Sequence, residues 1–258
     1  MNYIGIDIGS TCAKTAVLNE KKEIIQEFVQ PTGWSSVDTA EEILQKLKLA
    51  GISLSDDSSC CVATGYGRIS VPYADKAVTE ITCHALGAVH LFQQPDLTVI
   101  DIGGQDTKII QIEQGCVKDF IMNDKCAAGT GRFLEVMANT LSLRPNEMFD
   151  LARLGSDTTI SSMCTVFAES EIIGLIGKGE PKENIAYAVV DSTIRKVAAQ
   201  VSRMNGEMST FCLTGGLCEC EYIREALSKK IGKEVISSPD ARYAGAIGAA
   251  LRAMKIRK

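Results

Sequence analysis

One short pattern occurs twice in this sequence and divides the chain into two halves. Residues 6–14 read IDIGSTCAK and residues 100–108 read IDIGGQDTK, so the Asp, Ile, Gly and Lys positions match in register. In each copy an apolar strand ends in Asp, a Gly-containing turn follows, and Lys precedes a further apolar strand. A repeated supersecondary unit indicates two similar lobes. We therefore expect lobes at residues 1–95 and 96–258, with their hairpin turns facing one another.

Apolar runs of strand length alternate with helical patterns along the chain. We expect strands at residues 3–8, 15–18, 23–31, 60–64 and 97–102, and helices at residues 38–49 and 79–92. The first helix has apolar residues at Ala40, Ile43 and Leu47, which is the spacing of an amphipathic helix. Hairpins followed by helices are typical of an α/β domain with a mixed sheet.

Composition excludes several classes of protein. The 258 residues are 45% hydrophobic and 23% charged, which is ordinary for a globular protein of one large or two modest domains. The net charge of -5 argues against a nucleic-acid-binding face and against recruitment by acidic membranes. No apolar stretch approaches the roughly 20 residues of a spanning helix, and the start MNYIGIDIGS lacks the basic leader of a signal peptide. We therefore expect a cytoplasmic protein with no nucleic-acid or membrane partner.

The two Gly-containing turns have the properties of phosphate-binding sites. Glycine lets backbone N–H groups approach an anion closely, and successive N–H groups form a concave nest for phosphate. Asp7 and Asp101, at the strand ends, carry oxygen ligands suited to Mg²⁺, and Lys14 offers a point charge to a phosphate. The alternative is that both are ordinary β-hairpin turns. No Walker sequence is present, so the chain is not a P-loop protein.

These motifs resemble those of the actin, hexokinase and Hsp70 ATPase superfamily. IGIDIGSTCAKTAV is similar to its first phosphate motif, VIDIGGQDTKII to its second, FCLTGGLCE to its adenosine motif, and AGAIGAAL to a small-residue helix near the nucleotide. The resemblance implies an α/β fold of two ribonuclease-H-like lobes with a nucleotide cleft between them, and ATP or ADP with Mg²⁺ as cofactors. It assigns Asp7 and Asp101 to catalysis. It assigns nucleotide binding to Gly9, Ser10, Thr11, Lys14, Gly103, Gly104, Gln105, Gly215 and Gly216.

Two of the ten cysteines differ from the rest. No C-x-x-C pair occurs, so their spacing fits no zinc template, and we expect most of the ten to be buried and inert. Cys126 and Cys164 each follow a polar stretch and open a helix-like run, and a helix N-terminus stabilises the thiolate that binds metal. Two such ligands cannot complete a four-ligand iron–sulfur cluster, but a two-fold dimer supplies four. The alternative is two buried, inert cysteines.

The segments around these cysteines resemble a narrower family. NDKCAAGTGRFLE and SMCTVFAESE are similar to the signatures of activator ATPases of 2-hydroxyacyl-CoA dehydratases, which are grouped with ATPase subunits of benzoyl-CoA reductases. The resemblance implies a homodimer that holds one [4Fe–4S] cluster through Cys126 and Cys164 of both protomers. It implies ATP-driven transfer of one low-potential electron to an iron–sulfur dehydratase or reductase, with ferredoxin or flavodoxin as the electron donor. Cys218 and Cys220, beside the adenosine glycines, remain alternative ligands.

Two other functions are compatible with the superfamily. In a small-molecule kinase, such as a sugar kinase, Asn123 and Asp124 would supply the catalytic base, but a kinase has no use for the two cysteine segments. A nucleotide-binding scaffold that assembles like actin is the third hypothesis, and no long polar insertion supports it. We expect His84 and His90 to pack or to face solvent rather than to bind metal.

Overall fold

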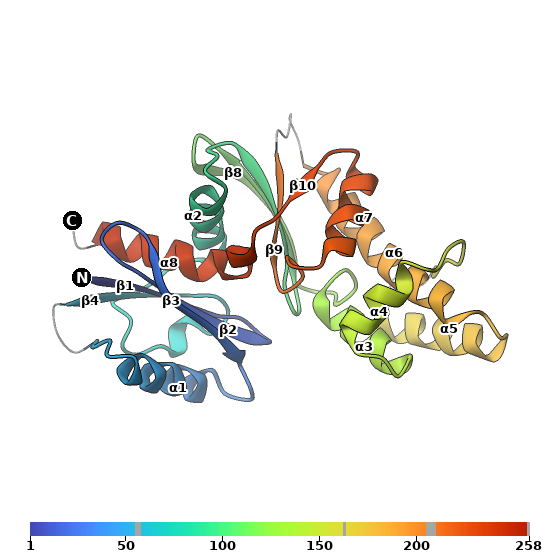
Figure 1. Ribbon diagram of the computed structural model, residues 1–258, viewed down its shortest axis with the longest axis horizontal. Helices are drawn as coiled ribbons and strands as arrows, with labels where there is room; N and C mark the ends of the chain where they lie inside the picture. Colours follow the sequence, from blue (N-terminus) through green and yellow to red (C-terminus); the bar gives the residue numbers. More distant parts are fainter. Residues whose placement is uncertain (55–57, 162–163, 205–209, 257–258) are drawn as a thin grey trace. The chain divides into compact units, whose positions relative to one another are not determined.

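The computed structural model describes the chain except for residues 55–57, 162–163, 205–209 and 257–258, and the described part forms two compact units (Figure 1). Unit 1 comprises Met1–Val99, Ile110–Asp119 and Ser238–Lys258, and unit 2 comprises Ile100–Ile109 and Phe120–Ser237. The division into lobes at residues 1–95 and 96–258, which the repeat predicts, remains a prediction.

The first sheet has five strands in the order β3-β2-β1-β4-β5. The strands are β1 (Asn2–Ile8), β2 (Cys12–Leu18), β3 (Ile24–Pro31), β4 (Ser59–Thr64) and β5 (Lys76–Ala77). The central strand β1 pairs antiparallel with β2 and parallel with β4, so the sheet is mixed, as expected. The repeat motif therefore occupies a hairpin at the middle of the sheet.

Helices cover both faces of this sheet. They are α1 (Ser36–Leu49), the 3₁₀ turn η1 (Arg68–Ser70), α2 (Glu80–Phe92), the 3₁₀ turn η2 (Pro239–Tyr243) and α8 (Ala244–Ile256). The apolar side of α1 packs with Ile4 and Ile6 on one face, whereas α8 lies on the other (Figure 1). A Cβ atom on Gly5 would lie only 1.8 Å from the carbonyl oxygen of Ala246. Only glycine at position 5 therefore lets α8 lie directly on β1.

The second sheet repeats the hairpin within a second set of strands, in the order β10-β9-β6-β7-β8. The strands are β6 (Leu97–Ile102), β7 (Thr107–Glu113), β8 (Cys116–Asn123), β9 (Phe211–Gly215) and β10 (Val235–Ile236). Strands β6, β7 and β8 have residues in both units, whereas β9 and β10 lie in unit 2 and pair in parallel. The second copy of the motif forms the turn between β6 and β7, which are neighbours in this sheet.

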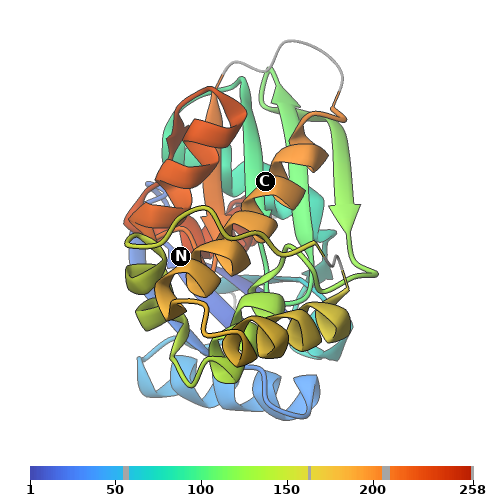
Figure 2. The same ribbon diagram turned by 90° about the vertical axis from the view of Figure 1, so that its right-hand side faces the viewer.

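The helices of unit 2 are arranged around one long helix. They are α3 (Gly131–Thr140), α4 (Pro145–Ala152), α5 (Thr165–Gly177), α6 (Lys182–Val201) and α7 (Glu221–Ile231). Helix α6, orange in Figure 2, contacts each of the other four. None of the described helices is both long and apolar enough to span a bilayer. The strands and helices expected around the two repeats are confirmed, including the helices at residues 38–49 and 79–92, which correspond to α1 and α2.

Candidate functional site

The first Gly turn joins β1 to β2 and is fixed by backbone bonds. Gly9 N donates to Cys12 O over 3.1 Å, Thr32 N donates to Thr11 O over 2.9 Å, and Thr32 Oγ1 donates to Gly9 O over 2.7 Å. Ser10 and Thr11 are exposed at the tip of the turn. The tip is therefore held in one shape and remains open to an anion.

Asp7 and Lys14 form the base of the same turn. They are directly opposite one another in the β1–β2 register, where Asp7 is buried and Lys14 is half-buried. The sequence-predicted residues Asp7, Gly9, Ser10, Thr11 and Lys14 are thus brought together in one hairpin.

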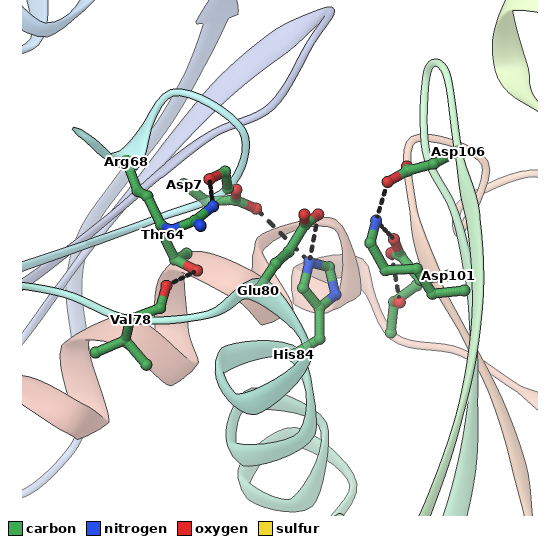
Figure 3. Close-up of polar contacts among 11 residues, drawn as sticks. Asp7, Thr64, Arg68, Val78, Glu80, His84, Asp101 and Asp106 are labelled. Carbon is green, nitrogen blue, oxygen red and sulfur yellow. Dashed lines mark hydrogen bonds and ion pairs between the residues drawn. The ribbon is translucent and has the colours of Figure 1, made fainter. Parts of the chain in front are cut away.

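A buried histidine lies against Asp7 (Figure 3). His84 Nε2, on α2, lies 3.7 Å from Asp7 Oδ2 and 3.7 Å from Glu80 Oε1. The sequence offered only a weak signal for this cluster, the four-residue spacing of Glu80 and His84 along one helix. His84 packs in the interior, one of the two alternatives expected for it, but its contact with Asp7 was not foreseen.

The second Gly turn carries a buried ion-pair cluster (Figure 3). Lys108 Nζ lies 3.3 Å from Asp101 Oδ2 and 2.8 Å from Asp106 Oδ2, and the Lys108 side chain is 1% exposed. Thr214 Oγ1, at the end of β9, donates to Asp101 Oδ1 over 2.8 Å. Lys14 and Lys108 occupy equivalent positions of the repeat, yet Lys108 is enclosed by carboxylates. The ion pairs of Lys108 were not predicted from the sequence.

The backbone of the second turn is bonded to the start of α3. Gly131 N donates to Gly103 O over 2.9 Å and Arg132 N donates to Gly104 O over 2.8 Å. These bonds use N–H groups that a helix N-terminus leaves without intrahelical partners. They fix the peptide planes of Gly103 and Gly104 and leave Gln105 exposed at the tip.

The adenosine motif ends β9, which is the neighbour of β6 in the sheet. Gly215 closes the strand with a positive φ of 84°, and Gly216 follows on the surface. Because Thr214 donates to Asp101, the adenosine glycines and the second phosphate turn are linked by a direct side-chain bond. The unit 2 residues predicted for nucleotide binding are therefore gathered at one end of this sheet.

The two predicted cluster ligands have different local structures. Cys164 is the N-cap residue of α5 and is exposed, whereas Cys126 is half-buried in the loop that follows β8. The expectation that a helix opens at Cys126 is wrong, because α3 begins at Gly131. The Asn123 side-chain amide donates to Cys126 O over 2.9 Å, and Gly129 has a φ of 87°, so the segment between them forms a turn. Residues 162–163, in the second cysteine segment, lie outside the described residues.

Most of the other cysteines are poor metal ligands. Burial raises the pKa of Cys83 to about 12 and raises the pKa values of Cys61 and Cys212 further. Burial also raises the pKa of Cys220, and Cys218 is buried. The raised pKa values of Cys61, Cys83, Cys212 and Cys220 favour the protonated thiol, whereas a metal is bound by the thiolate. Burial therefore disfavours Cys218 and Cys220 as alternative ligands.

The sequence matches the BadF/BadG/BcrA/BcrD ATPase family over residues 4–253. The chain belongs to this family. It is 43% identical over 257 residues to the (R)-2-hydroxyglutaryl-CoA dehydratase activating ATPase of Acidaminococcus fermentans, an alignment that covers 98% of this chain and 96% of the relative. The expected membership of an ATPase family related to dehydratase activators is thereby confirmed.

Solved structures of the family share the whole fold. The crystal structure of component A of the Acidaminococcus fermentans (R)-2-hydroxyglutaryl-CoA dehydratase has a TM-score of 0.92, with 41% identity and complete coverage of both chains. The activator of the 2-hydroxyisocaproyl-CoA dehydratase from Clostridium difficile, with bound ADPNP, has a TM-score of 0.90 and 34% identity, covering 99% of this chain and 95% of that one. A ROK family glucokinase from Streptomyces griseus has a TM-score of 0.62 at 17% identity, covering 99% of this chain and 100% of that one. This last likeness shows the fold alone, and the expected fold class is confirmed.

Gly245 of this ATPase-family chain gives a first testable prediction. A Cβ atom at Gly245, near the start of α8, would lie 2.4 Å from Asp7 Oδ2 and 2.8 Å from His84 Nε2. On the prediction that Asp7 is catalytic, we expect Gly245→Ala to displace its carboxylate and to lower kcat for ATP hydrolysis about a hundredfold, because small displacements of a catalytic group have effects of that size. Gln45→Ala is the control, since Gln45 is an exposed residue of α1 and its side-chain amide donates to the exposed Glu41 on the same helix. An unchanged kcat in Gly245→Ala would remove Asp7 from the catalytic machinery.

Proposed function

We propose that this chain is an ATP-dependent one-electron donor that activates an iron–sulfur acyl-CoA dehydratase or a related reductase. One observation carries the proposal: the loop that holds Cys126 is bonded directly to the second phosphate turn. Thr107 Oγ1, on β7, donates to Gly129 O over 2.7 Å in the interior, and the α3 start donates to the carbonyls of Gly103 and Gly104. A change in the turn on nucleotide binding therefore reaches the loop through hydrogen bonds rather than through a long flexible segment.

The residues of this chain fit an iron–sulfur cluster. Cys164 is an exposed thiol at the N-terminus of α5, where the helix dipole favours a negative charge. Lys196 Nζ lies 3.4 Å from the Cys126 sulfur and donates a hydrogen bond to it. Cys126 and Cys164 would supply two ligands from each protomer of a homodimer, and so four in all. When bound, the [4Fe–4S] cluster would take one electron from a reduced ferredoxin or flavodoxin and give it to the partner.

The surface of α5 supports a homodimer. Its exposed apolar side chains are Val166, Phe167, Ile173 and Ile176, which are 67%, 67%, 58% and 48% exposed. An exposed apolar patch of this kind marks a surface that binds another protein. Because the face begins two residues after Cys164, a second copy of the chain seated on it would bring its own cysteines close to the same place.

The two hairpin turns would bind the nucleotide. Phosphate oxygens would accept from the backbone N–H groups of Ser10, Thr11, Gly104 and Gln105, while the N–H groups of Gly9 and Gly103 close their own turns by donating to Cys12 O and Asp106 O. The adenosine would lie against Gly215 and Gly216. Lys14 would place its charge on a terminal phosphate. Asp7 and Asp101, which are 3% and 2% exposed, would hold Mg²⁺ through its water ligands and orient the attacking water.

A kinase function is not favoured. In the kinase hypothesis, Asn123 and Asp124 supply the catalytic base. The side-chain amide of Asn123 instead donates to Cys126 O over 2.9 Å and to Ala128 O over 3.3 Å. Asn123 therefore shapes the cysteine loop. The similarity to the named dehydratase activators extends over almost the whole length of each, whereas the glucokinase shares only the fold.

The proposal is tested with protein purified without oxygen and supplied with iron and sulfide. We expect a homodimer with one [4Fe–4S] cluster per two chains, and ATP-dependent reduction of an iron–sulfur 2-hydroxyacyl-CoA dehydratase when dithionite is the electron source. ATP replaced by ADP is the control and should not support repeated turnover. Colourless, monomeric protein that still hydrolyses ATP would leave the ATPase assignment standing and end the electron-transfer proposal.

A further inference from the structure

The side-chain ammonium of Lys196 contacts the sulfur of Cys126, a proposed cluster ligand. Lys196, in the second half of α6, places its Nζ 3.4 Å from the Cys126 sulfur, within the range of an N–H···S hydrogen bond. The contact joins residues that are 70 positions apart in the chain, so it depends on the tertiary fold. It is partly buried, and the charge is therefore screened less by solvent than it would be on an open surface.

The stem of Lys196 is also held in place. A Cβ atom on Gly129 would lie 3.3 Å from Cδ and Cγ of Lys196, so the absence of a side chain at Gly129 leaves room for the lysine to cross the loop. The preceding residue on α6, Arg195, donates from Nη2 to Ile160 O over 3.2 Å and pairs with Asp191 over 2.9 Å. Two consecutive side chains of one helix thus reach the loop of Cys126 and the segment that leads to Cys164. The fold therefore places the ammonium beside the Cys126 sulfur.

A fixed positive charge at a cluster ligand has a predictable electrostatic effect. One-electron reduction adds one negative charge to the cluster, and that charge is delocalised onto the ligand sulfurs. A nearby cation and an N–H···S bond stabilise the more negative, reduced state more than the oxidised state. Lys196 would therefore make a bound cluster easier to reduce, and in the proposed function the cluster must accept an electron before it can pass one on.

We propose that Lys196 is a positioning residue for the Cys126 ligand that raises the reduction potential of the cluster in its resting state. This inference rests on the proposed function and deepens it. It gives a residue on α6 a role in reduction of the cluster by its electron donor, and that residue lies outside the phosphate turns and outside the two cysteine segments.

The test is a reductive titration of the anaerobically reconstituted homodimer with dithionite and redox dyes, followed by visible absorption and electron paramagnetic resonance. The variant Lys196→Met keeps most of the stem and removes the charge. We expect the ratio of reduced to oxidised cluster at a fixed ambient potential to fall about tenfold, which corresponds to a decrease in midpoint potential of about 59 mV for one electron. Lys196→Arg keeps the charge and should restore most of the wild-type potential.

A matched control comes from the same helix. Lys182, the first residue of α6, is exposed, so Lys182→Met removes the same charge from α6 without touching the cysteine loop and should leave the midpoint potential unchanged. A wild-type midpoint potential in a loaded Lys196→Met protein overturns the inference and leaves the proposed function intact. Iron lost from both Lys196→Met and Lys196→Gln, but kept by Lys196→Arg, also overturns it, because Lys196 would then serve to bind the cluster. A wild-type protein that binds no cluster overturns both proposals.

Discussion

Replacing either Cys126 or Cys164 by serine is expected to abolish the bound iron while ADP binding is retained. Each substitution removes two of four thiolates at once, because both protomers of the proposed dimer carry it, and a serine hydroxyl is a poor ligand for an iron–sulfur cluster. The nucleotide turns lie in other segments, so their hydrogen bonds to ADP do not depend on either thiol. The measurements are iron and sulfide content, visible absorption, and calorimetric titration with ADP.

Cys116 supplies the control for these variants. It is exposed, like Cys164, but it stands at the start of β8, outside both cysteine motifs. Cys116→Ser should bind as much iron as the wild-type protein. Full iron content in Cys126→Ser or Cys164→Ser would show that other residues hold the metal.

Replacing Lys108 by methionine is expected to lower the free energy of unfolding by about 3–5 kcal/mol. The substitution leaves the buried Asp101 carboxylate without its cation, and removing one partner of a buried ion pair typically costs that much. Since domains are stable by only about 5–15 kcal/mol, the change should be large in urea denaturation monitored by circular dichroism.

The matched control is Lys118→Met. Lys118 pairs with Glu113, but both side chains are nearly half exposed, so the expected change in unfolding free energy is only about 0–1 kcal/mol. Equal effects of the two substitutions would mean that the buried ion pair of Lys108 stabilises the fold no more than an exposed ion pair does.

Much of the fold follows from local pattern. The hairpin at residues 3–18 is recognisable because two apolar strands flank a glycine turn, and α1 because its apolar residues recur at helical spacing. The start of α3 could not be placed in the same way. The segment after Cys126 has helix-compatible small residues, but the amide of Asn123 and the left-handed backbone at Gly129 hold it as a turn.

The candidate site was predictable where it depends on motifs and not where it depends on packing. Asp7 and Asp101 end matching strands, so the repeat alone brings attention to them. The partners of these carboxylates differ between the two copies, since His84 contacts Asp7 whereas Lys108 contacts Asp101. The link from Lys196 to Cys126 spans 70 residues and leaves no local signature, because nothing in a helical pattern says which loop a lysine will reach.

The position of α8 has a consequence for biosynthesis. The face of β1 that Gly5 leaves flat is covered by a helix encoded more than two hundred codons later, at Ala244–Ile256. Translation proceeds from the N-terminus, so the apolar residues of β2 that pack on α8, Ala16 and Leu18, stay uncovered on the ribosome until nearly the whole chain has emerged. A polypeptide released before codon 244 therefore contains all five strands of its first sheet but lacks the helix that covers one face, and that exposed apolar surface can be bound by chaperones and cleaved by proteases.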